Sequence, residues 1–384
     1  MMSEDSKVPL IMQEYPGLKE IPRVDLAKTP VPVQRLKGLE EELGHEGIWI
    51  KREDLSHDVY GGNKARKFEY QLADAIEKGK KKIMTFGGLG SNQTLANAVY
   101  CREFEDQGLE AVSFVYDQIL TEHVRYNLKL DHFYGSEIIH KHSLAGTVLS
   151  MLWYYITHKD TYLIWAGTST PLGTIGFVDA IFELTEQIKN GDLEEPDYIF
   201  VPDGSTGTAA GITLGCELAG LKTHVYGVMV TDELIASKNR VLGLANRTYK
   251  LLRKHDKSIP SIKKSQLAER LTILTDFRGD AYGRPTEEGF EAKELLAECD
   301  NIQLDLTYTG KTCSAMIAYI REKKERIKDK KFLFWLTLNT VDHHEEAESV
   351  DWHDLPDNLH QYFDGTVPLQ EQCVQARNCL DDVT

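Results

Sequence analysis

Short apolar runs alternate along most of this chain with longer segments in which apolar residues recur every three or four positions. The short runs are typical of buried strands, and the periodic segments are typical of helices that cover them. The predicted strands are residues 47–51, 83–86, 111–115, 137–139, 198–201, 224–230, 271–275, 302–304 and 332–337. The predicted helices are residues 63–78, 92–104, 122–132, 143–157, 174–190, 208–219, 233–254, 286–299 and 311–327. This regular alternation predicts an α/β fold with a parallel sheet.

Chain length and C-terminal composition suggest how the fold is divided. With 384 residues the chain is long enough for two domains. Residues 342–384 carry eleven Asp or Glu residues against one basic residue, Arg377, which predicts an acidic C-terminal appendage. Its aromatic residues Trp352, Tyr362 and Phe363 suggest that part of this segment is ordered.

Net charge and cysteine usage narrow the class of protein. The 44 basic and 60 acidic side chains give a net charge of −16, which disfavours nucleic acid and anionic membranes as partners. The N-terminal segment lacks an apolar signal core, and no apolar run approaches the roughly 20 residues of a membrane helix. The six cysteines form no Cys-x-x-Cys pair, so we interpret them as buried free thiols, with a Cys373–Cys379 disulfide as the minor alternative. We therefore expect a cytoplasmic protein.

A lysine follows a glycine pair in the segment Gly61-Gly62-Asn63-Lys64. A lysine amine forms a Schiff base with an aldehyde cofactor, and glycines allow a flat ring to approach the backbone. A lone lysine at a helix start is usually just solvated, so this interpretation depends on companion motifs. With them, the sequence predicts pyridoxal 5′-phosphate (PLP) chemistry on an amino acid.

A phosphate cradle is the first companion motif. Residues 204–211 read Gly-Ser-Thr-Gly-Thr-Ala-Ala-Gly and lie between a predicted strand and a predicted helix. Backbone N–H groups and the helix dipole bind a dianion at such a junction, and hydroxyl groups add donors. The alternative is a tight turn of small residues that binds no ligand. Neither a Gly-Lys-Ser/Thr ending nor a Gly-x-Gly-x-x-Gly pattern is present, which disfavours nucleotide-binding loops. Lys67, one helical turn after Lys64, can place a second cation near the phosphate.

A second glycine turn, Gly87-Gly88-Leu89-Gly90, leads into Ser91, Asn92, Gln93 and Thr94. Ser91 is a natural helix N-cap, which orients neighbouring N–H groups toward a substrate carboxylate. The amide of Asn92 can donate to the phenolic oxygen of the cofactor ring. A cap without any ligand is the structural alternative.

Residues 343–346 (His-His-Glu-Glu) are of types that bind metal ions. Adjacent histidines on a helix point to different faces, so we expect no metal site there.

Four motifs in order make the chain similar to a known family. Residues 51–54 (Lys-Arg-Glu-Asp) lead into Gly-Gly-Asn-Lys-x-Arg-Lys, and Gly-Gly-x-x-Ser-Asn-Gln-Thr places its serine 27 residues after Lys64. Residues 282–289 (Tyr-Gly-Arg-Pro-Thr-Glu-Glu-Gly) and 308–311 (Tyr-Thr-Gly-Lys) follow, with their tyrosines 26 residues apart. Over about residues 28–338 the chain resembles the tryptophan-synthase-β-like, fold type II PLP enzymes. Within them it resembles the branch of D-cysteine desulfhydrase and 1-aminocyclopropane-1-carboxylate (ACC) deaminase.

The resemblance implies a role for each motif. It implies that Lys64 carries the cofactor and that Asn92 holds the ring oxygen. Ser91, Asn92 and Gln93 contact the substrate, while Tyr282 and Tyr308 flank the reacting carbon, unless the tyrosines are ordinary core residues. The phosphate ligands that it implies are Lys67, Ser205, Thr206, Gly207 and Thr208.

The residue after the second tyrosine bears on the reaction. ACC deaminase-like chains have a carboxylate there, which favours a protonated pyridine nitrogen and a strong electron sink. This chain has Thr309, as D-cysteine desulfhydrases do, with Thr337 as another candidate partner of that nitrogen. A weaker sink suffices to expel a thiolate, so we expect β-elimination from D-cysteine, giving pyruvate, sulfide and ammonia. The alternatives are ACC deaminase, a related PLP racemase or dehydratase, and a PLP-binding protein without turnover.

Several positions depart from the family pattern near the substrate. Leu89-Gly90 replaces Ile-Gln, Gln93 replaces a histidine and is more ACC-deaminase-like, and Leu95 replaces an arginine. Residues 335–339 (Trp-Leu-Thr-Leu-Asn) replace a His-Thr-Gly-Gly-like turn. The missing side chain at Gly90 suggests room for a larger amino acid.

The resemblance also implies the architecture. A large PLP-binding domain of residues 1–64 plus 191–341 would hold an inserted small domain, 65–190. Parallel-rich twisted sheets flanked by helices are expected, with the cofactor in the interdomain cleft and a homodimer as the assembly.

Overall fold

The computed structural model describes residues 8–364, and the chain forms two compact units. Unit 1 contains the described residues up to Asp74 together with Gly167–Val341, and unit 2 contains Ala75–Ala166 and the described residues from Asp342 onward. The sequence placed the junctions after residues 64 and 190. In the structure the first junction falls within helix α3 (Ala65–Glu77). The second precedes helix α7 (Pro171–Asn190), because α7 packs in the core of unit 1.

Unit 1 contains a six-stranded sheet. Its strand order is β1 (Val33–Arg35), β2 (Ile48–Arg52), β10 (Phe332–Leu336), β7 (Tyr198–Asp203), β8 (His224–Met229) and β9 (Leu271–Leu274). The β1–β2 pair is antiparallel and the other pairs are parallel. The parallel-rich sheet expected from the alternation is therefore confirmed.

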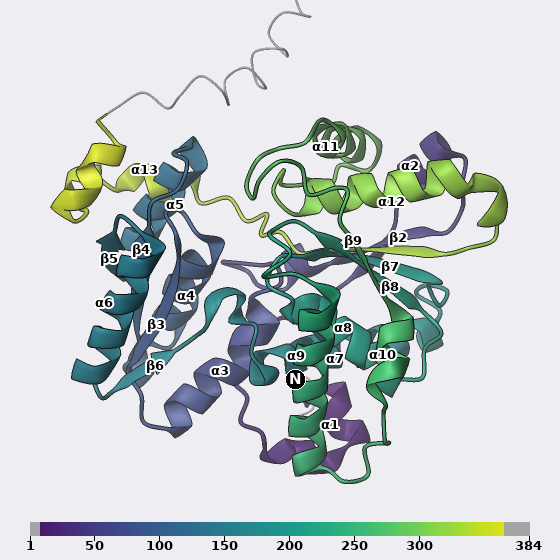
Figure 1. Cartoon of the computed structure of the whole chain (residues 1–384), viewed down its shortest axis with the longest axis horizontal. Helices are drawn as coiled ribbons and strands as arrows, with labels where there is room; N and C mark the ends of the chain where they lie inside the picture. The colour runs from purple at the N-terminus through teal and green to yellow at the C-terminus, as the bar shows by residue number, and fades with distance from the viewer. Residues whose placement is uncertain (1–7, 365–384) are drawn as a thin grey trace, which may run out of the picture. The chain divides into compact units, whose positions relative to one another are not determined.

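Helices cover both faces of this sheet (Figure 1). Along β10, Leu333 and Trp335 pack with α7, α8 (Gly207–Leu218) and α9 (Lys238–His255), whereas Phe332 and Phe334 pack with the opposite layer. That layer is formed by α2 (Lys37–Leu43), α11 (Glu287–Asp300) and α12 (Thr309–Lys323). Because both faces are buried, the strand sequences are apolar throughout rather than alternating.

A buried cluster of four charges joins β2, α3 and α7 in unit 1. Lys51 Nζ lies 2.6 Å from Glu183 Oε1, and Arg66 Nη2 lies 3.0 Å from the same oxygen. Arg66 Nε also donates to Glu53 Oε2 over 2.9 Å. The charges sum to zero, and each head group has an oppositely charged partner, which offsets the cost of burial. The 51–54 motif and Arg66 thereby fix the start of α3, where Lys64 lies.

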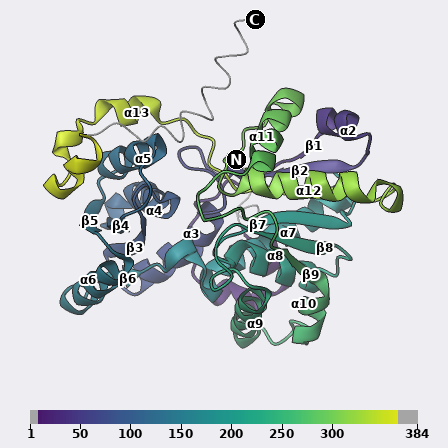
Figure 2. The same cartoon turned by 45° about the horizontal axis from the view of Figure 1, so that its top comes forward.

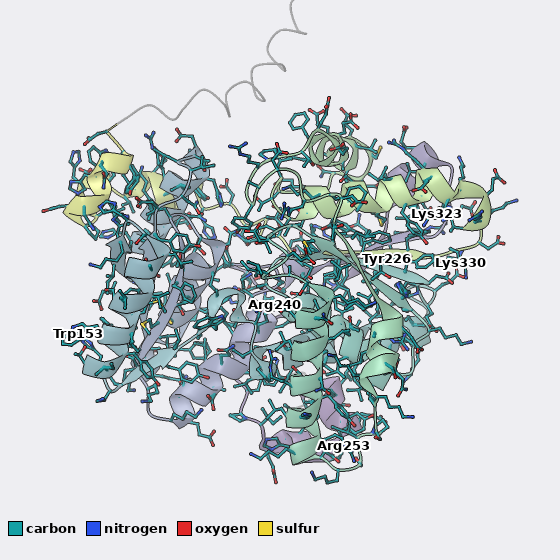
Figure 3. All side chains as sticks on the ribbon, in the orientation of Figure 1. Trp153, Tyr226, Arg240, Arg253, Lys323 and Lys330 are labelled. Carbon is teal, nitrogen blue, oxygen red and sulfur yellow. The ribbon has the colours of Figure 1, made fainter. Side chains whose placement is uncertain are left out.

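Unit 2 contains a four-stranded parallel sheet in the order β5 (Glu137–Lys141), β4 (Glu110–Tyr116), β3 (Lys82–Gly88) and β6 (Thr161–Leu163). Helix α6 (Leu144–Thr157) packs on the face that carries Val112 and Phe114. Helix α5 (Glu122–Phe133) packs with Val115 on the other face, beside α4 (Asn92–Glu103). The outer side of α6 is apolar and exposed, and Trp153 projects from it (Figure 3).

Residues 342–364, the described part of the predicted acidic appendage, pack on unit 2. Helix α13 (His344–Ser349) lies beside α5 (Figure 2) and is followed by two 3₁₀ turns. Val350, Leu355 and Leu359 join the core around Val124. Trp352, Tyr362 and Phe363 pack against the same core, as expected for a segment that these aromatic residues order in part. Residues 365–384, including Arg377, Cys373 and Cys379, lie outside the described part.

Short elements account for most other differences from the sequence prediction. The strand expected at 302–304 is wrong: Ile302 and Leu304 are buried beneath α11 and α12, but their backbone is not paired in a sheet. Pattern analysis did not detect several short elements, because each spans only one or two turns or pairs. These are β1, β6, α1 (Leu10–Glu14), α2, α10 (Lys264–Arg270), α13, and the 3₁₀ turns η2 (Pro16–Glu20), η3 (Glu53–Leu55), η4 (Glu105–Gln107), η5 (Ala166–Thr168), η6 (Lys324–Arg326), η7 (Trp352–Asp354) and η8 (Asp357–Tyr362).

Two sequence-level expectations can be compared with the described residues. None of the helices among residues 8–364 combines the length and apolar character needed to cross a bilayer. The four described cysteines are free thiols: Cys101, Cys216 and Cys313 are buried, and Cys299 is partly exposed.

Candidate active site

The glycine turn before Lys64 is held against the end of β10. Gly62 has φ +88°, and a Cβ atom there would lie 2.7 Å from the carbonyl oxygen of Thr337, so only glycine is accommodated. Asn63 N donates to that same oxygen over 3.2 Å, and Gly61 N donates to Asn339 Oδ1 over 2.8 Å. The turn presents Lys64 at the first residue before α3.

Lys64 is half-buried at this position. Its Nζ donates to Asn63 Oδ1 over 3.0 Å, and Asn63 Nδ2 donates to Thr208 Oγ1 over 3.1 Å. Burial lowers the pKa of Lys64 to about 8. A much larger fraction of this amine is therefore neutral near pH 7 than for an ordinary lysine, which suits attack on an aldehyde.

The predicted cradle lies at the N-terminus of α8, directly after β7. Thr206 is its N-cap and has φ +71°, a conformation that residues other than glycine rarely adopt and that is concentrated at functional sites. The first-turn N–H groups of a helix, here from Gly207 onward, have no acceptor within the helix. Ser205 and Thr208 supply hydroxyl groups on either side of this end. This arrangement is suited to a phosphate dianion.

A third segment, residues 167–170, borders the predicted cradle and was not singled out from the sequence. Ser169 Oγ donates to Ser205 Oγ over 2.9 Å, and Lys67 Nζ donates to the carbonyl oxygen of Gly167 over 3.2 Å. A Cβ atom on Gly207 would lie 2.7 Å from Ser169 Oγ and 3.1 Å from Lys67 Nζ. The glycine therefore keeps open a space that a hydroxyl group and an ammonium group both face.

The charges around this space indicate an anionic ligand. Neither Lys64 nor Lys67 has an ion pair with any of the residues that the structure describes, and both amines are buried. Burial, followed by the nearby charge of Lys64, lowers the pKa of Lys67 well below its usual value. Asp203 lies close enough to counter this in part, but burial raises the pKa of its own carboxyl to about 7. A bound dianion would neutralise Lys67, and an aldehyde would take up the amine of Lys64, so the residues fit a phosphorylated aldehyde cofactor.

The two predicted tyrosines meet beside the cradle. Their hydroxyl groups are hydrogen-bonded to each other, and the ring centroids of Tyr282 and Tyr308 are 6.0 Å apart. A Cβ atom on Gly204 would lie 3.2 Å from the ring of Tyr308. Burial, followed by the proximity of Tyr282, raises the pKa of Tyr308 well above its usual value. Tyr308 is therefore a protonated hydrogen-bond donor at neutral pH.

Thr309 is fully buried at the start of α12 and bonds to a residue that the sequence did not single out. Its Oγ1 donates to Asp305 Oδ2 over 2.6 Å. The Asp305 carboxylate also accepts the N–H groups of Thr307 and Tyr308, over 2.8 Å and 2.6 Å. A four-residue offset between an aspartate and a threonine before a helix was the only sequence signal for this pair. Thr337 contributes its carbonyl oxygen to the turn before Lys64, as described above.

The predicted substrate residues lie in unit 2, at the start of α4. Ser91 is the N-cap, and its Oγ accepts the N–H of Gln93 over 3.2 Å. A Cβ atom on Gly87 would lie 2.3 Å from Ser91 Oγ, which explains the glycine in the turn. Gln93 is buried, and Asn92 is partly exposed. The capping role of Ser91 and an orientation of α4 amides toward an anion are compatible, as expected.

Two residues of α5 orient Asn92 and were missed because they lie more than thirty residues further along the chain. Asn127 Nδ2 donates to Asn92 Oδ1 over 3.0 Å and to the carbonyl oxygen of Gly90 over 2.8 Å. His123 Nε2 lies 3.3 Å from Asn92 Oδ1. Helix α5 therefore holds the amide oxygen of Asn92 and fixes the orientation of this side chain.

The structure contradicts the idea that Gly90 opens space for a larger substrate. Gly90 has φ +72°, and a Cβ atom there would lie 2.6 Å from the Cα atom of Val124. The backbone of α5 already occupies the place of a side chain. Leu89, the other departure in this turn, is buried in the core of unit 2.

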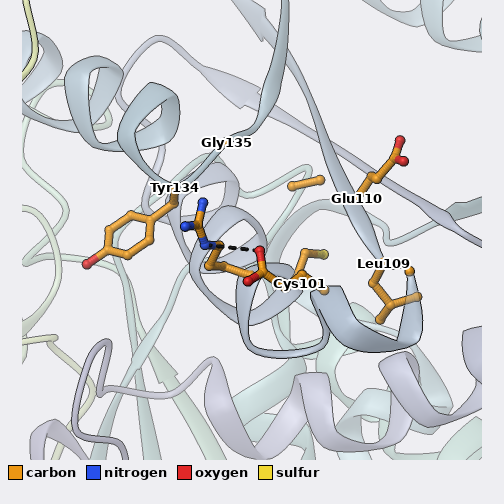
Figure 4. Close-up of a pocket in the computed structure, with 9 residues that line it drawn as sticks. Cys101, Leu109, Glu110, Tyr134 and Gly135 are labelled. Atoms are coloured by element: carbon orange, nitrogen blue, oxygen red, sulfur yellow. Dashed lines mark ion pairs between the residues drawn. The ribbon is translucent and has the colours of Figure 1, made fainter.

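A surface cavity of unit 2 is separate from these residues. It has a volume of about 300 Å³ and lies at the C-terminal end of α4, far along the helix from Ser91 (Figure 4). The ion pair of Arg102 with Glu105 crosses its wall, and none of the predicted site residues lines it.

Comparison with known proteins agrees with this geometry. The family described as pyridoxal-phosphate dependent enzyme matches residues 24–337. A protein of Thermotoga maritima named putative 1-aminocyclopropane-1-carboxylate deaminase is 31% identical over 315 residues, covering 79% of this chain and 94% of that protein. A D-cysteine desulfhydrase of Klebsiella pneumoniae is 30% identical over 321 residues, covering 82% and 92%. A solved structure described as an ACC deaminase homologue has a TM-score of 0.72 at 25% identity, covering 89% and 98%.

The chain therefore belongs to the pyridoxal-phosphate dependent enzyme family. It is an enzyme of the fold type II group whose cofactor is PLP, and the expected α/β fold class is confirmed. The resemblance drawn from the four motifs, to the branch of D-cysteine desulfhydrase and ACC deaminase, is confirmed as well.

Proposed function

We propose that this enzyme catalyses β-elimination from D-cysteine, converting it with one water molecule to pyruvate, ammonia and hydrogen sulfide. The observation that carries the proposal is the neutral hydroxyl of Thr309 where a carboxylate would favour ACC chemistry. Relatives named D-cysteine desulfhydrase, at 29–30% identity over most of the chain, support it. The second candidate is ACC deamination to 2-oxobutyrate and ammonia. Gln93 and the Thermotoga maritima relative favour it.

The residues of unit 1 would hold the cofactor at three points. Lys64 would bind its aldehyde carbon, and Thr309, with Thr337 nearby, would face the ring nitrogen. The phosphate would lie at the start of α8, where it is contacted by Lys67, Ser205, Thr206, Gly207 and Thr208. Two buried amines without a carboxylate partner among the described residues support this assignment. When bound, PLP withdraws electrons from the α-carbon of an attached amino acid, so that its proton becomes acidic.

Proton transfer is assigned to Lys64 and Tyr308. The amine of Lys64, with a pKa of about 8, would take the Cα proton of the substrate. The bond between Cβ and sulfur then breaks, and the electron pair leaves with sulfur. Tyr308 and Tyr282 share a hydrogen bond, and the raised pKa of Tyr308 keeps its proton available to the departing thiolate. Tyr308 is thus a better donor than base.

Substrate binding is assigned to the start of α4. Ser91, Asn92 and Gln93 would bind the carboxylate of the amino acid, and Asn92 would also donate to the ring oxygen of the cofactor. The capping geometry of Ser91 and the fixed amide of Asn92 support these roles. A helix N-terminus favours the negative charge of a carboxylate.

A single set of assays tests the reaction. The purified enzyme is incubated separately with D-cysteine, L-cysteine and ACC, while sulfide and 2-oxo acids are measured. We expect sulfide and pyruvate from D-cysteine at a rate well above that for ACC. Faster formation of 2-oxobutyrate from ACC would replace the proposal by the second candidate. Bound cofactor without any turnover would indicate a PLP-binding protein.

Substitution of the lysine tests the site. Lys64→Ala should abolish covalent cofactor attachment, seen as loss of its visible absorbance, together with nearly all turnover. Lys189→Ala, on the exposed surface of α7, is the matched control and should behave as the unmodified enzyme. Normal activity in Lys64→Ala would refute the assignment.

We further propose a cytoplasmic homodimer. Free buried cysteines support a reducing compartment. Self-association is supported by the exposed outer side of α6, where Leu149 and Trp153 are 68% and 70% accessible and Leu152 and Ile156 continue the apolar surface. Light scattering after size-exclusion chromatography should give twice the chain mass, and Trp153→Asp should reduce it. Cell fractionation tests the location.

A further inference from the structure

Three metal-ligating side chains, none of them assigned to the reaction, meet at one corner of the unit 2 sheet. Asp117 directly follows β4, while His140 lies in β5 and His142 just after it. In the parallel register Val115 pairs with His140, and Tyr116 pairs with Lys141. Asp117 and His142 are the next residues along the two strands, so they lie side by side where the strands end. The one-residue spacing of the histidines puts both imidazoles on the same face.

The ligand atoms of these side chains are close enough to share one ion. They all lie within 4.8 Å of one another, with Asp117 Oδ1 2.6 Å from His140 Nε2 and Oδ2 3.1 Å from His142 Nδ1. Ligand atoms of a tetrahedral zinc ion are roughly 3.3 Å apart, given zinc–ligand distances of about 2.0–2.1 Å. Movements of less than about 1 Å would therefore convert the cluster into three ligands of one ion. We propose that Asp117, His140 and His142 bind a divalent transition-metal ion, with zinc as the best match to two imidazoles and a carboxylate.

A second layer of side chains fixes the ligands and comes from the C-terminal segment. The Asn358 amide lies 3.3 Å from His140 Nδ1, and with its oxygen turned to that nitrogen it accepts the Nδ1–H and leaves Nε2 of this buried imidazole free of a proton to bind the ion. Tyr362 Oη donates to Asp117 Oδ1 over 2.5 Å and lies 3.2 Å from His140 Nε2. Such outer partners orient metal ligands and raise their affinity. They also leave the fourth position to the Tyr362 oxygen or to water.

The competing explanation is a hydrogen-bonded hub, in which Asp117 bonds to His140 and Tyr362 and no metal ion is involved. The role of His142 distinguishes a metal site from this hub. The bonds of Asp117 to His140 and Tyr362 already satisfy a hub that fastens η8 to the sheet. The side chain of His142 is 72% exposed, so the hub does not depend on it. A metal site does depend on it, because two protein ligands seldom hold zinc tightly. Removing His142 therefore tests metal binding without disturbing the core.

The second histidine cluster of the chain provides the matched control. Buried His343 lies 3.1 Å from the hydroxyl of Tyr134, whereas His344 is exposed. Among the residues that the structure describes, these two do not belong to any group of three ligands. His344→Ala thus removes an exposed histidine of the same unit that has no place in the proposed site.

The experiment is a zinc titration of the intact holoenzyme after treatment with a chelator, read by competition with a chromogenic zinc indicator. Cys373 and Cys379 are replaced by serine in every variant, so that tail thiols cannot bind the ion. We expect one zinc ion per chain, at least a tenfold weaker affinity in His142→Ala and Asp117→Asn, and unchanged affinity in His344→Ala. Zinc should raise the thermal midpoint in the proteins that bind it. Equal affinity in His142→Ala, or no binding to the parent enzyme, would overturn the proposal.

Discussion

The hydroxyl of Thr309 donates its proton to the carboxylate of Asp305 over 2.6 Å at the start of α12. The same oxygen accepts the backbone N–H of Asp305 over 2.8 Å, so both its proton and one of its two lone pairs are engaged within the turn. The carboxylate is held in turn by backbone N–H groups of the same turn, so it cannot rotate away. The pair thus fixes the Thr309 side chain in one orientation, and position 309 itself carries no charge.

The Thr309–Asp305 pair determines which substitutions should change the preference of the enzyme between D-cysteine and ACC. In Thr309→Glu alone, two carboxylates would face each other, and one would stay protonated. In the double variant Thr309→Glu with Asp305→Asn, a single carboxylate remains and strengthens the electron sink. We expect the ratio of ACC turnover to D-cysteine turnover to rise about tenfold or more in the double variant, corresponding to about 1.4 kcal/mol. Steady-state assays with both substrates measure it. An unchanged ratio would contradict the role given to position 309.

The open space at Gly207 predicts a loss of cofactor affinity on adding one methyl group. Gly207→Ala would push a Cβ atom to 2.7 Å from Ser169 Oγ and 3.1 Å from Lys67 Nζ, displacing groups that face the proposed phosphate site. Losing one charge-assisted hydrogen bond costs about 1.5–3 kcal/mol, so PLP should bind about 10- to 100-fold more weakly. Fluorescence titration of the apoenzyme measures this. The control is Gly243→Ala in α9, where only Arg247 approaches, at 3.6 Å, and affinity should not change.

The lowered pKa of Lys64 predicts how cofactor uptake depends on pH. Only the neutral amine attacks an aldehyde, and with a pKa of about 8 roughly a tenth of it is neutral at pH 7. The rate of covalent PLP uptake by the apoenzyme should therefore rise with pH and level off above about 8. Stopped-flow absorbance measures the rate. A rate that still increases tenfold per pH unit up to pH 10 would indicate an ordinary lysine.

Asp131 in α5 has a buried carboxylate. We predict that its replacement raises the free energy of unfolding by an amount that depends on pH. Its carboxylate oxygens are buried without a hydrogen-bond partner among the described residues, and burial raises the pKa to about 8. A folded-state pKa above the unfolded value of 3.8 means that stability falls as pH rises from 3.8 to 8. Asp131→Asn removes this loss, so its advantage should grow by about 3 kcal/mol between pH 5.5 and 8.

Thermal or urea unfolding at the two pH values measures the effect of Asp131→Asn. Asp106→Asn, an exposed change in the same unit, should show no such dependence. A stability difference that is the same at both pH values would show that the Asp131 carboxyl does not titrate in this range.

The sequence predicted the local conformation of those parts of the candidate site that are continuous in the chain. The strand, glycine turn and helix around Lys64 follow from neighbouring residues, and so do the cradle at 204–208 and the cap at Ser91. Each depends on turn conformation and helix ends, which a short motif specifies. The strand–helix alternation was equally local, and it predicted the parallel sheets.

Residues brought in from distant segments could not be found in this way. Ser169 and Gly167 reach the cradle from a turn with no phosphate motif, and Asn127 reaches Asn92 from another helix. The space beside Gly90 was misjudged because Val124 fills it from α5. The Asp117, His140 and His142 group was also overlooked, although it follows from the strand ends once parallel register is assumed.

The buried quartet of Lys51, Glu53, Arg66 and Glu183 has a consequence for how this sequence can diverge. Losing any single member leaves an unmatched ion in the protein interior, a change that commonly destabilises by about 3–5 kcal/mol. Substitutions at these four positions should therefore occur in pairs, with a positive and a negative residue replaced together. A chain in which only one of them differs should carry a compensating substitution beside it.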